Sequence, residues 1–114
     1  MLRVLVLTAL LAACEMPMPI DDYLCSPGGT QLTYQSFGRG FLDANCNSCH
    51  SSEAGYRNGA PSSFRFDTLD DVHAHKDRIF IRAAASNTTM PPGPDDPTPE
   101  SRDQLAEWLA CGAP

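Results

Sequence analysis

The sequence predicts an all-α fold in a single domain. Three segments carry apolar residues at helical spacing, and two of them begin with a threonine suited to cap a helix. No strand–helix–strand pattern surrounds the closely spaced cysteine pair in the middle of the chain. With 114 residues, ten prolines and eight glycines, the chain can form one loop-rich domain with a modest core.

The first 13 residues are typical of an export signal. Arg3 supplies the positive charge, residues 4–11 form a short apolar stretch, and small residues precede Cys14. Leu-Ala-Ala-Cys at 11–14 resembles the lipobox of bacterial lipoproteins, in which the cysteine is acylated after cleavage. The alternative is a plain signal peptide followed by an incidental cysteine. We expect residues 1–13 to be removed and Cys14 to carry the lipid.

Residues 14–29 are predicted to be a tether, and residues 30–114 the folded domain. Met16-Pro17-Met18-Pro19 cannot start a stable helix, and Pro27-Gly28-Gly29 is typical of a turn. The tether is short, so we expect the domain to lie close to the membrane.

The first helix is predicted over residues 30–45. Its apolar face is formed by Tyr34, Phe37, Phe41 and Leu42. Gly38 and Gly40 each weaken a helix by up to about 1 kcal/mol relative to alanine. Glycines inside a helix often mark the close approach of another backbone.

Directly after this helix stands Cys46-Asn47-Ser48-Cys49-His50, a pattern typical of covalent haem attachment. Two thiols at this spacing can add to the two vinyl groups of one porphyrin, and the histidine then becomes the proximal iron ligand. A thioredoxin-like redox pair would need a βαβ context, and a zinc site would need a second Cys or His pair. One haem c per chain is therefore the preferred interpretation.

Residues 51–66 are predicted to be a loop, because Gly55, Gly59 and Pro61 exclude regular structure. The aromatic residues of this loop are expected to pack against the edge of the haem. The alternative is that they anchor the loop in the core. They are Tyr56, Phe64 and Phe66.

The other two helices have clear start signals. The middle helix is predicted over 67–86, with Thr68 as its N-cap and two aspartates in its first turn. Its buried stripe comprises Val72, Ile79, Phe80 and Ala83, whereas His73 and His75 are expected at the surface. The last helix begins at Thr98-Pro99, presents Leu105, Trp108 and Leu109, and ends at Gly112.

Together these features resemble the class I c-type cytochromes, over residues 31–113. In that family a glycine stands eight residues before the first haem cysteine, as Gly38 does, and an apolar residue about four before it, as Phe41 and Leu42 do. The last helix carries Leu-x-x-aromatic-Leu, which Leu105, Trp108 and Leu109 match. The resemblance implies small helices and loops wrapped around one covalent haem, with the first and last helices crossing.

The resemblance also implies two further site residues. The distal ligand in the family is a methionine in a proline-bearing loop, which Met90-Pro91-Pro92 matches; the alternative is a methionine that fills the core. A proline after the haem motif accepts, through its carbonyl, the second N–H of the proximal histidine, and Pro61 is the candidate; the alternative is a proline that only shapes the loop. Arg82, at the end of the middle helix, is a candidate partner for a haem propionate or else a solvent-exposed arginine.

The remaining cysteines also have an expected partner. Of five cysteines, Cys25 and Cys111 are left after lipidation and haem attachment. In an oxidising periplasm we expect them to form a disulfide; the alternative is two free buried thiols. This pair, and the lack of a lysine-rich haem edge, depart from the best-known family members.

These observations predict a one-electron carrier rather than an enzyme, facing the periplasm on a lipid anchor, with the outer membrane favoured. The net charge of −6 argues against nucleic acid and favours redox partners with a basic docking patch. Two other functions stay open. One is a haem-based enzyme or gas sensor in which Met90 is displaced, and the other is a structural subunit of an envelope complex.

Overall fold

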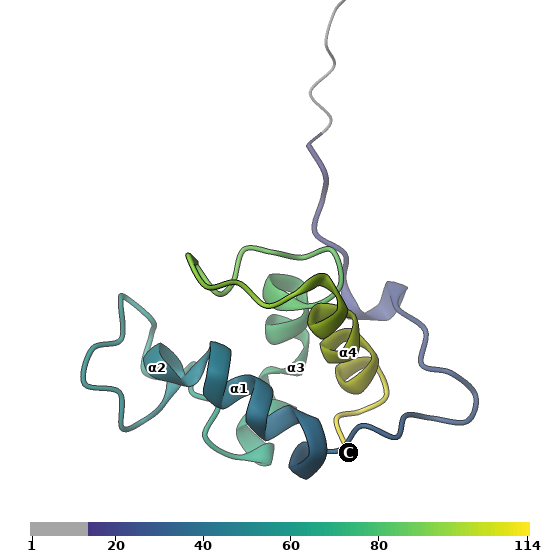
Figure 1. Cartoon of the computed structure of the whole chain (residues 1–114), viewed down its shortest axis with the longest axis horizontal. Helices are drawn as coiled ribbons and strands as arrows, with labels where there is room; N and C mark the ends of the chain where they lie inside the picture. Colours follow the sequence, from purple (N-terminus) through teal and green to yellow (C-terminus); the bar gives the residue numbers. More distant parts are fainter. Residues whose placement is uncertain (1–13) are drawn as a thin grey trace, which may run out of the picture.

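The computed structural model describes residues 14–114, and within that range it is helical with no β-strand. The predicted signal, residues 1–13, lies outside the described residues. Residues 14–114 form four α-helices, and Figure 1 shows long loops on either side of the third. They are α1 (Arg39–Asn45), α2 (Asn47–His50), α3 (Leu69–Ala83) and α4 (Pro99–Ala110), preceded by a 3-10 turn, η1 (Ile20–Asp22), and a π-helical turn, η2 (Tyr34–Gly38).

The first predicted helix is shorter than expected and is not uniform. It begins at Tyr34, because the hydroxyls of Thr33 and Ser36 form a reciprocal capping box at that point. Residues 30–33 are not helical, and the Thr30 hydroxyl donates instead to the carboxylate of Glu107 at 2.6 Å. The helix passes from η2 into α1 and breaks at Cys46, whose backbone leaves the helical region.

The two later helices begin where predicted. Thr68 caps α3 and forms a capping box with Asp71, while Thr98 caps α4 with Pro99 in the first turn. The predicted middle helix extended to 86, but α3 ends at Ala83 because the backbone of Ala84 is extended.

The core lies where α3, α4 and the η2–α1 segment meet. Trp108 of α4 is at its centre, stacked against Tyr34 with ring centroids 6.4 Å apart and edge-on to Phe37 at 6.1 Å. A Cβ added to Gly38 would clash with the Trp108 ring. The predicted close approach at Gly38 is therefore real, but it involves the indole ring. At Gly40 an added Cβ would meet nothing within 4 Å.

Part of the segment predicted as a tether, residues 14–29, contacts the helical domain, although most of its residues are exposed. Met18 donates its backbone N–H to Asn87 Oδ1 at 2.9 Å, and its carbonyl accepts from Asn87 Nδ2 at 2.8 Å. Beyond it, η1 packs against α3 and α4. In Figure 1 the start of the described chain runs away from the helices. From Met18 onward, part of this segment is therefore bonded to the helical domain through Asn87.

No helix in the described part of the chain has the length and apolar character needed to cross a bilayer.

Candidate cofactor site

One cavity of about 570 Å³ collects the residues that the sequence singles out for a cofactor. Its volume is within the range typical of ligand and cofactor sites. Four segments form its wall: the α1–α2 junction, the loop after α2, the C-terminal half of α3, and the loop between α3 and α4. The predicted cofactor residues Cys46, Cys49, His50, Pro61, Arg82 and Met90 all line it.

The short helix α2 presents both thiols and the histidine to this cavity. The backbone N–H groups of Cys49 and His50 both donate to the Cys46 carbonyl, at 3.2 and 2.9 Å. This single turn sets the three side chains at i, i+3 and i+4, the spacing that shares one helix face. Both thiols are free. Burial raises the pKa of the Cys46 thiol to about 12, against the opposing effect of Arg102, so the thiol is neutral at pH 7.

His50 is oriented by a backbone carbonyl, as predicted, but not by that of Pro61. Its Nδ1 lies 2.7 Å from the Phe64 carbonyl oxygen. Because a carbonyl only accepts, Nδ1 carries the proton, and in the neutral imidazole Nε2 is then the nitrogen with the lone pair. The ring also stacks on Phe66, with centroids 4.7 Å apart.

The predicted role of the Pro61 carbonyl was wrong. A turn closed by the Phe64 N–H on Pro61 O, at 3.0 Å, separates the two carbonyls. The Pro61 carbonyl instead accepts from Arg57 Nη2 at 2.9 Å.

Met90 lines the cavity wall, and its backbone is fixed on both sides. Its N–H donates to the Arg82 carbonyl at the end of α3, and its carbonyl accepts from Arg102 Nη1 on α4, each at 2.8 Å. The loop that carries the sulfur is thus bonded to both neighbouring helices.

Arg102 was missed by the sequence reasoning. It is only 4% exposed, and its Nη1 also donates to the carbonyls of Ala83 and Asn87, at 2.8 and 3.2 Å. Asp96 is its nearest carboxylate, at 4.0 Å. The available signal was its position: Arg102 is three residues before Leu105, on the apolar face of the last helix.

Three arginines give the cavity a basic wall in a chain whose net charge is −6. Arg78 and Arg82 lie one helical turn apart on α3, and Arg57 belongs to the loop after α2. Asp95 is the single carboxylate on the wall. Within residues 14–114 none of the three arginines has a carboxylate within 4.0 Å. Arg57 and Arg78 were not predicted, although Arg78 stands four residues before Arg82.

The loop aromatics and the two histidines of α3 agree with the sequence predictions only in part. Phe64 and Phe66 line the cavity, but Tyr56 does not and is 77% exposed, because its loop turns outward. His73 is exposed and bonds the Ala113 carbonyl at 2.9 Å. His75, expected at the surface, is half-buried against Phe64, with ring centroids 4.9 Å apart.

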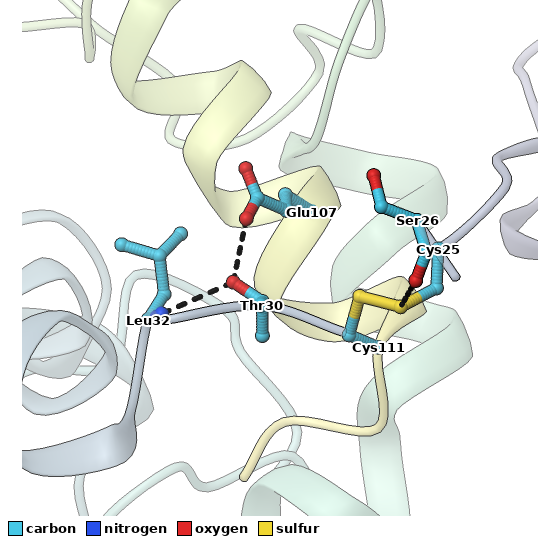
Figure 2. The surroundings of a disulfide bond; sticks show 6 residues. All are labelled: Cys25, Ser26, Thr30, Leu32, Glu107 and Cys111. Carbon is cyan, nitrogen blue, oxygen red and sulfur yellow. Dashed lines mark hydrogen bonds between the residues drawn. A yellow bond between two sulfur atoms is a disulfide. The ribbon is translucent and has the colours of Figure 1, made fainter. Parts of the chain in front are cut away.

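The remaining cysteines lie away from the cavity. Figure 2 shows the disulfide between Cys25 and Cys111, whose Cα atoms are 4.9 Å apart, beside the Thr30–Glu107 bond. This is the pairing that the cysteine count predicts. Cys14 is exposed and free.

A second hollow of about 630 Å³ is lined mainly by polar side chains of η2, α1, α2 and the residues just before α3. Asp67 on its wall accepts hydrogen bonds from Ser51 and from the Ser52 N–H, and these lower the pKa of its carboxyl. No residue expected to bind a cofactor lines this hollow. Within the described range, no three His, Cys, Asp or Glu side chains gather as a metal site would need.

No protein-family model, no curated protein and no solved structure matches this chain.

Proposed function

We propose that the chain is an electron carrier of the bacterial envelope, built as a class I cytochrome c-like domain. It carries one haem c attached through Cys46 and Cys49. The observation that carries this proposal is that the Cys-x-x-Cys-His turn and Met90 line one cavity, although forty residues separate His50 from Met90.

The chemistry of the cavity wall fits haem. His50 offers Nε2, because its Nδ1 is bonded to the Phe64 carbonyl. Apolar side chains such as Phe64, Phe66 and Ile79 suit a porphyrin face, and the basic wall suits its carboxylates. Haem bound there would supply a one-electron ferric–ferrous couple, whose potential a methionine ligand raises.

The fixed backbone of Met90 supports a carrier rather than a sensor or an enzyme. Bonds to Arg82 O and from Arg102 hold the residue on both sides, so a sulfur bound to iron would be hard to displace. If His50 and Met90 both bound the iron of a haem held there, no position would be left for a substrate. Electrons would then leave to a docked protein, and the acidic net charge of the chain favours a basic partner.

The envelope location rests on the cysteines. Leu-Ala-Ala-Cys at 11–14 supports a lipid on Cys14, and the Cys25–Cys111 disulfide suits an oxidising compartment. In cell fractionation, wild-type protein should stay with membranes and Cys14→Ser should be released. Equal release of both proteins would contradict the lipid anchor.

Two measurements test the haem proposal. After acid denaturation and organic extraction, the red colour should stay with the wild-type polypeptide, whereas Cys46→Ser/Cys49→Ser should lose it. The reduced wild type should not bind CO rapidly, but Met90→Ala should, because its sixth position is open. Extractable colour would refute covalent attachment. Rapid, stoichiometric CO binding by the wild type would favour the sensor or enzyme instead.

A further inference from the structure

The loop between α2 and α3 has little backbone bonding of its own. Three isolated turns span residues 51–64, closed by N–H groups of Ala54, Ala60 and Phe64 on carbonyls three residues earlier, at 2.9 to 3.2 Å. The loop contains no helix or strand, although it forms one wall of the cavity. Something other than secondary structure must hold these turns together.

The guanidinium of Arg57 joins all three turns. Its Nε donates to the Ala60 carbonyl at 3.1 Å, and its Nη1 donates to that of Ser51 at 2.6 Å. Its Nη2 donates to the carbonyls of Pro61 at 2.9 Å and Phe64 at 3.4 Å. One side chain therefore bonds four carbonyls spread over fourteen residues of loop.

The last of these carbonyls is also the acceptor for His50. Phe64 O receives the His50 Nδ1–H at 2.7 Å and lies within reach of Arg57 Nη2 at 3.4 Å. The position of this oxygen therefore depends on the guanidinium as well as on the turn that contains it.

We propose that Arg57 is a positioning residue for His50. By holding the loop closed, its guanidinium keeps the Phe64 carbonyl against Nδ1, which fixes the ring orientation and the electron-donating strength of the imidazole. The inference rests on the proposed function, because it treats His50 as the proximal haem ligand.

The side chain must be arginine for geometric reasons. A guanidinium presents five N–H donors in a rigid plane, whereas a lysine ammonium is a compact charge with three donors on a flexible stem. Arg57 has no carboxylate within 4.0 Å among residues 14–114, so an ion pair does not account for its placement. Lysine would keep the charge but could not bridge four carbonyls.

The sign of the effect on potential separates positioning from charge. A short bond from Nδ1–H makes the imidazole more electron-donating, which favours ferric iron and lowers the potential. Loosening that bond raises the potential. Removing a positive charge near the iron would instead lower it. Arg57→Lys keeps the charge and disturbs only the geometry.

The experiment compares haem-loaded wild type, Arg57→Lys and the control Arg65→Lys. Arg65 follows Phe64 but is exposed and bonds Asp71, at 3.3 Å. For each protein, NMR measures solvent exchange of the His50 Nδ1 proton, and a redox titration gives the potential. Arg57→Lys should exchange this proton about fivefold faster or more and shift the potential upward. Arg65→Lys should match the wild type.

Two results would overturn the assignment. If Arg57→Lys matches Arg65→Lys in exchange and potential, the guanidinium does not position His50, while the haem proposal stands. If the wild type holds no covalent haem, the proposed function fails, and this inference fails with it. If Arg57→Lys does not fold, the test is instead the rate at which the Arg57 side-chain N–H protons of the wild type exchange with solvent. Protected protons support positioning, and exchange at the rate of a free arginine refutes it.

Discussion

Arg102 is a buried cation that uses backbone carbonyls, rather than a close carboxylate, as its partners. Its Nη1 donates to the carbonyls of Ala83, Asn87 and Met90, so the two hydrogens of this nitrogen are shared among three acceptors. Removing it would leave these buried oxygens unsatisfied, and each such group costs about 1–3 kcal/mol. The residue therefore ties α4 to the loop that carries the predicted distal ligand.

We expect Arg102→Met to lower the free energy of unfolding by about 2–4 kcal/mol, because the three carbonyls lose their donor. Urea unfolding measures the change. The control Arg65→Met removes an arginine whose side chain is 56% exposed, and it should cost no more than about 0.5–1 kcal/mol. Similar losses in the two variants would show that the Arg102 bonds contribute little.

At the scale of helices, Gly38 and Gly40 play opposite roles although only one residue separates them. Gly38 lies under the Trp108 ring at the contact between η2 and α4, and it is buried. Gly40 is in α1, exposed, with open space where a Cβ would lie. Packing therefore requires glycine only at position 38.

This pair gives a prediction of opposite signs. Gly38→Ala should destabilise the protein by about 1–3 kcal/mol, because the new methyl group must displace a fully buried indole. Gly40→Ala should stabilise it by up to about 1 kcal/mol, because alanine is the better helix former and meets nothing. Thermal or urea unfolding of both variants tests this. Equal effects would mean that α4 does not pack on η2 through Trp108.

At the scale of the whole molecule, the beginning and the end of the domain are tied together. The N–H of Tyr34 donates to the Pro114 carbonyl at 2.7 Å, and Trp108 Nε1 donates to the same oxygen at 3.2 Å. The Cys25–Cys111 disulfide and the Thr30–Glu107 bond join the same two regions (Figure 2). The docked N-terminal segment is therefore part of the folded unit.

The disulfide closes a loop with a sequence separation of 86, so the chain-entropy model gives it about 4–5 kcal/mol of stabilisation. Cys25→Ser/Cys111→Ser should lose an amount of this order in urea unfolding, whereas Cys14→Ser should not change stability. Thiol labelling of the unfolded, unreduced haem protein gives an independent check. Labelling of both Cys25 and Cys111 would show that the bond does not form in the natural protein.

The features that the sequence predicts well are local. Helix starts at Thr68 and Thr98 follow from capping within three residues, and the stripe from Val72 to Ala83 follows from helical spacing. The Cys-x-x-Cys-His motif is local too, since the turn from Cys46 to His50 brings its cysteines and histidine to one face. The first helix was the least accurate element, because the competing Thr30–Glu107 bond spans 77 residues.

The sequence by itself determined the helical class, the cysteine–histidine turn and the candidate methionine. The tertiary structure alone decided which carbonyl faces His50, which arginines hold the loops, and that Asn87 docks the segment at Met18. The physical reason is that every residue carries the same backbone carbonyl, so sequence does not distinguish Pro61 from Phe64 as an acceptor. The path of the folded loop chooses between them, and that path depends on contacts between distant residues.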